Sequence, residues 1–241
     1  LYECMAETYV PLLNAISELY DEGIKAKLTV GITPILAEQL NDEHLKNGFV
    51  EYLDSRIKSV AKDLDRYPDP KVPHSQHLKY LAKYYYDWFN NIKDSFVNKY
   101  GMDLISAFKK YQDLGCIEIT TSGATHGFSP LLATDNNLNA QFKVGSDTTK
   151  RLFGKKAKGC WLPECAYRQG YEYVGKDGQK HWRPAIELTL QNLMLLKVVI
   201  LLVADELLAF MEILNIFRFR NVNQQVMIHI LLIGFLMHKL Q

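Results

Sequence analysis

Apolar side chains recur every three or four positions through much of the first 114 residues, which is the spacing of one face of an α-helix. The clearest stripe predicts a long helix, with Asn41 as its N-cap and Asp42 and Glu43 placed favourably against its dipole. The positions of this stripe are Leu45, Phe49, Leu53, Ile57, Val60 and Leu64.

Similar stripes predict further helices over 9–20, 75–96 and 103–114. Gly23 and Gly115 are typical residues just past a helix end, and Ser75 is a candidate N-cap. The helix at 75–96 follows a proline-rich loop, and its many aromatic rings are typical of core and rim packing. A ligand-binding platform formed by these rings is the alternative.

Three short apolar segments separate the helices, and we expect strands near Lys27–Gly31, Ile117–Thr121 and Gly159–Leu162. Strands joined through helices form a parallel sheet with the helices outside it, so the pattern predicts an α/β fold. Ligands bind beyond the carboxyl ends of such strands. Thr33, His126 and Glu164 follow the three strands and are therefore expected at one face.

Each of these strand-end residues also has a simpler interpretation. Glu164 follows Pro163, which cannot donate to a sheet, and it either performs chemistry or caps the next turn. His126 lies between two glycines, which allow an unusual backbone, and it is either a ligand-facing or a structural histidine. The local residues alone leave both alternatives open.

The later chain is less regular. Residues 131–153 are expected to be mostly helical, with a break at Gly145 and Ser146. A polar turn is expected at 175–180 and a helix start at Arg183-Pro184. Beyond Leu193 the chain becomes very apolar, but the run at 226–237 is shorter than the ~20 residues that span a bilayer.

Composition excludes several classes of function. A net charge of +1 argues against nucleic acid or an anionic membrane as partner. The four cysteines form no C-x-x-C pair, so neither a zinc ribbon nor a redox motif is expected, and we expect no metal site. Cys116 and Cys160 lie in apolar runs and are expected to be reduced, which favours a cytoplasmic protein. The first residues resemble the middle of a helix rather than a signal peptide, so we expect the chain to begin inside a larger protein.

Three motifs stand together in the chain: GITPIL at 31–36, SGATHGF at 122–128 and CWLPECAY at 160–167. Their order and spacing resemble glycoside hydrolase family 57, in particular its 1,4-α-glucan branching enzymes. The resemblance extends from Leu1 to about Leu193. It implies a partial (β/α)7 barrel, retaining chemistry on α-glucans, and no cofactor.

The resemblance also assigns roles by position. It implies that Glu164 is the catalytic nucleophile and that His126 and Trp161 bind substrate. A retaining enzyme needs a second carboxylate as acid/base, ~5–5.5 Å from the nucleophile. The family carries this acid in a later motif that is not found here, and Asp205 lies in a sequence context that does not match it.

The resemblance therefore divides the chain into residues 1–193, part of the catalytic barrel without its first strand, and an apolar tail at 194–241. A shifted reading frame would produce such a tail. The leading functional hypothesis is 1,4-α-glucan branching in glycogen- or starch-type metabolism. The alternatives are an α-amylase or 4-α-glucanotransferase of the same family, and a non-catalytic glucan-binding remnant.

Overall fold

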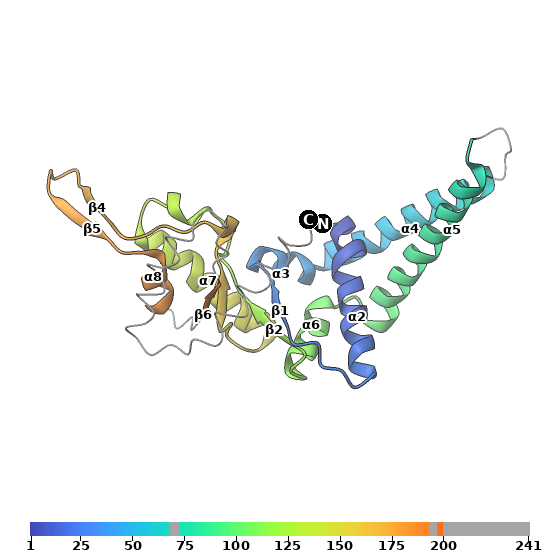
Figure 1. Cartoon of the computed structure of the whole chain (residues 1–241), viewed down its shortest axis with the longest axis horizontal. Helices are drawn as coiled ribbons and strands as arrows, with labels where there is room; N and C mark the ends of the chain where they lie inside the picture. Colours follow the sequence, from blue (N-terminus) through green and yellow to red (C-terminus); the bar gives the residue numbers. More distant parts are fainter. Residues whose placement is uncertain (68–72, 193–196, 200–241) are drawn as a thin grey trace, which may run out of the picture. The chain divides into compact units, whose positions relative to one another are not determined.

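The computed structural model describes residues 1–67, 73–192 and 197–199 (Figure 1). Strands β1, β2, β3 and β6 of this part of the chain pair in parallel. Strand β1, Leu28–Gly31, pairs in parallel with β2, Ile117–Thr120. A parallel bridge between Thr121 and Cys160 connects β2 to β3, Gly159–Trp161. Strand β6, Lys197–Val199, pairs in parallel with β3. The predicted parallel arrangement of the first three strands is confirmed.

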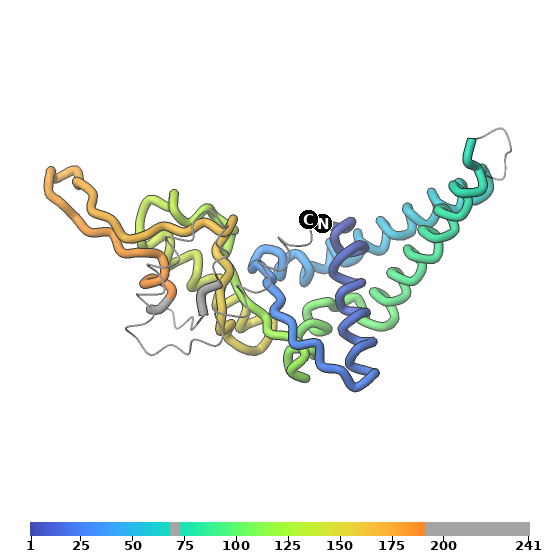
Figure 2. The backbone as a smooth tube through the Cα atoms, viewed as in Figure 1, coloured from blue at the N-terminus to red at the C-terminus, as the bar shows by residue number. Residues whose placement is uncertain are grey.

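Helices occupy most of the chain before β2, as the apolar stripes predicted, and α4 and α5 lie side by side over most of their length (Figures 1 and 2). Their bounds are α1 Tyr2–Cys4, the π-helix η1 Met5–Tyr9, α2 Val10–Asp21, α3 Pro34–Asn41, α4 Glu43–Arg66, α5 Ser75–Asp94, the π-helix η2 Ser95–Lys99 and α6 Leu104–Asp113.

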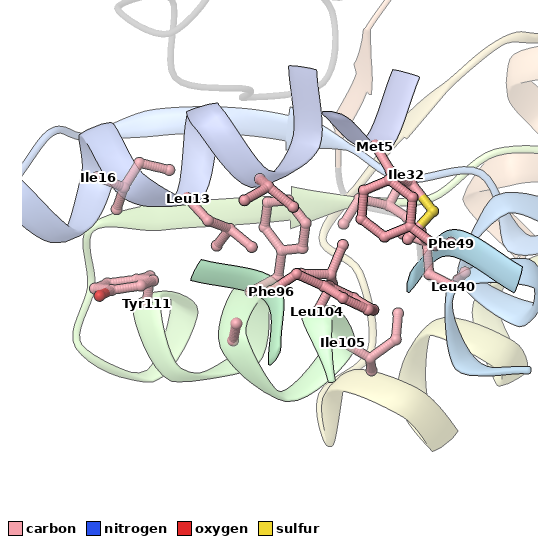
Figure 3. Packing of buried hydrophobic residues seen from close by; sticks show 14 of the residues in the cluster. Met5, Leu13, Ile16, Ile32, Leu40, Phe49, Phe96, Leu104, Ile105 and Tyr111 are labelled. Carbon is pink, nitrogen blue, oxygen red and sulfur yellow. The ribbon is translucent and has the colours of Figure 1, made fainter. Parts of the chain in front are cut away.

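The larger hydrophobic core lies among these helices and strands β1 and β2 (Figure 3). Phe49 of α4 and Phe96 of η2 are fully buried there and meet edge to face, with their ring centroids 4.8 Å apart. Burying a side chain of this size stabilises a fold by ~1.5–3 kcal/mol. The helical stripes read from the sequence are therefore the faces that build this core.

Two predicted N-caps differ from the observed ones. Asn41 is the last residue of α3, and the cap of α4 is Asp42, whose carboxylate accepts the Leu45 N–H at 2.9 Å. Asp42 has the extended backbone that a cap requires. His74, in the left-handed conformation, precedes α5, and Ser75 is already inside that helix.

The second half of the described chain has a smaller core, and apart from α7 its further elements are short. They are the 3-10 helix η3 Ser129–Leu131, α7 Asp135–Phe153, the 3-10 helix η4 Pro163–Cys165, β4 Tyr171–Val174, β5 Lys180–Arg183 and α8 Ile186–Asn192. The buried members of this smaller core are Leu138, Phe142, Cys160, Leu162, Ile186 and Leu190.

Two predictions for this half need correction, and one element of it was not predicted. Helix α7 passes through Gly145 and Ser146 without a break. Both residues are buried, and Gly145 lies against the main-chain carbonyl of Ser122. The predicted polar turn is observed, and it joins an antiparallel hairpin, β4–β5, that was missed although Asp177-Gly178 is a typical hairpin turn pair. Arg183 ends β5, so the helix begins later, at Ile186.

All four cysteines are free, and Cys116 and Cys160 are buried, as their apolar surroundings predicted. Burial raises the pKa of the Cys160 thiol to about 12. No helix within residues 1–67, 73–192 and 197–199 is long and apolar enough to cross a membrane. The apolar run at 226–237 lies outside the described residues.

Candidate functional site

Glu164 lies in a tight turn immediately after β3. Its neighbours close this turn through the Cys165 N–H to the Leu162 carbonyl and the Ala166 N–H to the Pro163 carbonyl, both at 3.0 Å. Glu164 and Cys165 both have φ of 55°, a left-handed conformation that costs a non-glycine residue ~1–2 kcal/mol. The Glu164 side chain is 67% exposed, so its carboxylate is open to an incoming molecule.

His126 lies in the loop that follows β2. Its main-chain N–H donates to the Gly123 carbonyl at 3.1 Å, and its φ of 58° is also left-handed. The imidazole Nε2 lies 3.6 Å from Glu164 Oε1, so the two strand-end residues meet as the sequence predicted. This separation allows an ion pair when the histidine is protonated and is slightly longer than a hydrogen bond.

Trp161 is the last residue of β3 and is partly buried. Its N–H donates to the Thr121 carbonyl at 2.9 Å, and its own carbonyl accepts the Ser122 hydroxyl at 2.8 Å. These two bonds join the chain before Glu164 to the chain before His126. The two motifs therefore form one unit at adjacent strand ends.

Thr33, the third strand-end residue, has a structural role. It is the N-cap of α3, with its hydroxyl accepting the Leu36 N–H at 3.4 Å. The structure thus brings His126 and Glu164 together and uses Thr33 to start the helix after β1.

A group of charged residues near the site was missed in the sequence. Arg183 Nε donates to Asp135 Oδ1 at 2.9 Å, and its Nη2 donates to the Leu132 carbonyl at 2.6 Å. Arg168, four residues after Glu164, is nearly buried, with Nη2 3.7 Å from Asp135 Oδ1, and desolvation lowers its pKa, with the charge of Arg183 adding to the effect. These contacts hold the base of the hairpin to the start of α7, and no spacing in the sequence indicates them.

The described part of the chain contains no group of three or more His, Cys, Asp or Glu residues that could hold a metal ion. Glu164 contributes a carboxylate to the site and His126 contributes an imidazole. A carboxylate held at the end of a buried strand beside a histidine is suited to nucleophilic or acid/base work.

A parallel α/β arrangement with polar groups at its strand ends is typical of ligand-binding α/β folds, both barrels and open sheets. The family model for glycosyl hydrolase family 57 matches residues 2–217, and the chain belongs to this family. The resemblance inferred from the three motifs is confirmed. The match continues past Leu193 and includes the position of β6.

Individual relatives agree with this assignment. The chain is 39% identical over 194 residues to a 1,4-alpha-glucan branching enzyme of Thermococcus kodakarensis, covering 80% of this chain and 27% of that protein. The crystal structure of a family 57 branching enzyme from Pyrococcus horikoshii aligns with a TM-score of 0.73 at 35% identity, covering 80% of this chain and 36% of that one.

An α-amylase from Thermotoga maritima, AmyC, aligns with a TM-score of 0.64 at 31% identity, covering 80% of this chain and 33% of that one. These relatives support the partial (β/α)7 barrel that was expected for the fold. The chain spans about a quarter of the Thermococcus protein and about a third of each of the two solved structures.

Proposed function

We propose that this chain is part of a retaining enzyme that acts on α-glucans, with Glu164 as the nucleophile that attacks the anomeric carbon. The observation that carries the proposal is the 3.6 Å approach of His126 Nε2 to Glu164 Oε1 at the ends of adjacent parallel strands. Both residues belong to motifs that match the family, and both have a strained backbone. Such strain persists where the surrounding structure maintains it, and it gathers at active sites.

The proposed chemistry begins with the ionised carboxylate. Glu164 attacks the sugar carbon, the bond to the leaving oxygen breaks, and a covalent glycosyl-enzyme forms. His126 stabilises the negative charge of Glu164 before attack and hydrogen-bonds the sugar beside it. Trp161, at the end of β3, lies three residues before Glu164, and in this proposal its ring packs against a sugar face.

The reaction also needs an acid to protonate the leaving oxygen. We assign this role to no residue of this chain. Asp205 lies outside the described residues, and its sequence context argues against it. We therefore expect the isolated chain to bind glucan and to turn it over very slowly or not at all.

Branching is the favoured reaction because the relatives named as branching enzymes, at 39% and 35% identity, are more similar than the α-amylase at 31%. The enzyme would then act in glycogen- or starch-type metabolism. The free cysteines favour a cytoplasmic location, and the net charge of +1 argues against nucleic acid or an anionic membrane as partner.

The division of the chain at Leu193 remains a prediction. The parallel pairing of β6 with β3 and the family match to residue 217 both concern residues beyond this boundary. Genomic DNA across Leu193 tests it, because a one-base shift that restores a later family motif would reveal a frame change. Limited proteolysis should then cut after about Pro184 before it cuts 28–167.

Glucan binding tests the proposed function in this chain. Titration with maltoheptaose should shift the NMR signals of Trp161, His126 and their neighbours, and Trp161→Ala should weaken binding at least tenfold. Trp182→Ala, on the exposed hairpin, is the matched control and should leave affinity unchanged. Shifts confined to other parts of the chain would contradict the proposed site.

Iodine-stained amylose separates the reactions. Branching changes the spectrum without new reducing ends, hydrolysis produces reducing ends, and a non-catalytic remnant does neither. We expect no measurable turnover without the missing acid. Robust turnover would mean that a residue dismissed above supplies the acid, and Asp205→Asn would be the first variant to examine.

A further inference from the structure

One face of α7 contacts the chain between β2 and His126 at three successive points. The residues of this face are Gln141, Gly145 and Thr149, spaced four apart and therefore aligned along the helix. We call them the α7 seam. Their partners, Thr125, Ser122 and Thr121, follow one another in the opposite direction along the chain.

The contacts of Thr149 and Gly145 lie in the buried part of the seam. The Thr149 hydroxyl donates to the Thr121 hydroxyl at 2.9 Å. A Cβ built on Gly145 would lie 2.2 Å from the Ser122 carbonyl oxygen, which no real side chain tolerates. Gly145 is therefore the residue that lets the backbone of α7 reach the loop after β2.

Gln141 makes the third contact and holds the loop itself. Its Oε1 accepts the Thr125 N–H at 2.9 Å, its Nε2 donates to the Thr125 hydroxyl at 2.9 Å, and its main-chain carbonyl accepts the Ala124 N–H at 3.0 Å. Three bonds from one residue fix the two positions directly before His126.

The seam also reaches the Glu164 turn. The Ser122 hydroxyl donates to the Trp161 carbonyl at 2.8 Å. Gly123 lies between Gln141 and Pro163, since a Cβ there would be 3.5 Å from Gln141 Oε1 and 3.3 Å from Pro163 Cγ. The loop that carries His126 is thus held between α7 and the turn that carries Glu164.

The His126 ring has little support of its own. Its Nδ1 is buried and has no hydrogen-bond partner among the described residues. Because no such bond orients the ring, its approach to Glu164 depends on the backbone of the loop. That backbone is left-handed at His126 and needs contacts that maintain it.

We propose that the α7 seam positions His126 against Glu164 and that Gln141 is its decisive positioning residue. The catalytic meaning of this role rests on the proposed function, whereas the positioning itself does not. The seam couples the packing of α7 to the geometry of the site. A change on the helix face would move the imidazole without touching either catalytic motif.

Three variants of the 241-residue chain test the proposal by NMR and hydrogen exchange. Gln141→Leu removes the side-chain bonds and should speed exchange of the Thr125 amide at least about fivefold, as expected for one lost hydrogen bond, and shift the ring signals of His126. Gln141→Glu keeps an acceptor for the Thr125 N–H and hydroxyl, so the Thr125 amide exchange and the His126 ring signals should both remain as in the wild type. Gln112→Leu, which removes the bond from Gln112 Nε2 to the Phe153 carbonyl, is the matched control and should leave His126 unchanged.

Thr125→Ala provides a second route, because this exposed loop residue can lose its hydroxyl without affecting the core. It should shift the His126 signals in the same direction as Gln141→Leu. Unchanged His126 signals in both variants would overturn the proposal, whatever Glu164 does. A different result would contradict the proposed function alone: the variants shift the His126 signals as expected, but the wild-type chain shows no response to maltoheptaose at the site. The positioning role of the α7 seam would then still hold.

Discussion

The two halves of the described chain are held together by different forces. Before β2, helices meet through large apolar side chains such as Phe49 and Phe96. Around β3 and α7 the apolar cluster is small, and hydroxyl, amide and main-chain groups make the contacts that matter for the site. The first half is stabilised by burial, which any well-packed apolar set supplies, and the second is specified by directional bonds.

The contrast separates stability from function. Loss of an apolar side chain in the helical half should weaken the whole fold and leave the site geometry intact while the chain remains folded. Loss of a seam contact should disturb the site with a smaller effect on stability. The following predictions test this difference, beginning with the largest expected effect.

Phe49→Ala should lower the free energy of unfolding by ~3–5 kcal/mol, because it leaves a cavity in the larger core beside Phe96. Urea denaturation measures the change. Leu131→Ala is the control, because Leu131 is 81% exposed and its truncation should change stability by less than ~0.5 kcal/mol. Similar effects of the two substitutions would contradict the assignment of the core.

Cys160 should make the sheet near the site sensitive to alkali. Its thiol pKa is raised from 9.0 to about 12 by burial, so between these values the unfolded chain loses the proton first. The free energy of unfolding is therefore unaffected by this thiol below pH 9 and falls as the pH rises towards 12. The total loss at the upper end is roughly 3–4 kcal/mol. Stability curves of wild type and Cys160→Ala should diverge in slope over this range, and parallel curves would contradict it.

Two glycines inside helices provide a direct comparison between the halves. Gly145→Ala forces a Cβ against the Ser122 carbonyl and should cost ~1–3 kcal/mol, although alanine favours a helix. Gly48→Ala meets the tip of the Tyr2 side chain, which can turn away, and should change stability by less than ~1 kcal/mol. Thermal denaturation of both variants measures the difference, and an equal cost would mean that the seam is no more rigid than the helical half.

The smallest effect concerns the start of α4. Asp42→Ala should cost ~1 kcal/mol because it removes the bond to the Leu45 N–H. Asn41→Ala should be nearly neutral, since Asn41 ends α3 and makes no capping contact with α4. The reverse order in denaturation experiments would favour the cap that the sequence first suggested.

The fold was predictable where burial determines it. The stripe through Phe49 and Leu53 predicted α4, and the apolar segments predicted strands that are parallel. Caps were less predictable because Asn41 and Asp42 are chemically similar neighbours and only backbone geometry distinguishes them. The hairpin β4–β5 was missed although Asp177-Gly178 is a typical hairpin turn, because its strands are mostly exposed and add little to an apolar core.

The candidate site was predictable as a pair of motifs but not as a geometry. The strand ends and the family resemblance indicate His126, Trp161 and Glu164 as candidates without any knowledge of the contacts between them. The sequence predicts a helix break at Gly145, because a glycine that allows close approach cannot be distinguished in sequence from one that breaks a helix. The bonds of Gln141 likewise depend on the approach of α7 to the loop, which no local pattern encodes.

The most direct test of the central claim is covalent trapping of Glu164 in this chain. A 5-fluoro-α-glucosyl fluoride carries a leaving group that needs no protonation, so the missing acid does not prevent attack. We predict that mass spectrometry finds the glycosyl adduct on the peptide containing Glu164 and that Glu164→Gln abolishes it. A chain whose site binds maltoheptaose but forms no adduct, or one labelled on another residue, would contradict the assignment of Glu164 as the nucleophile.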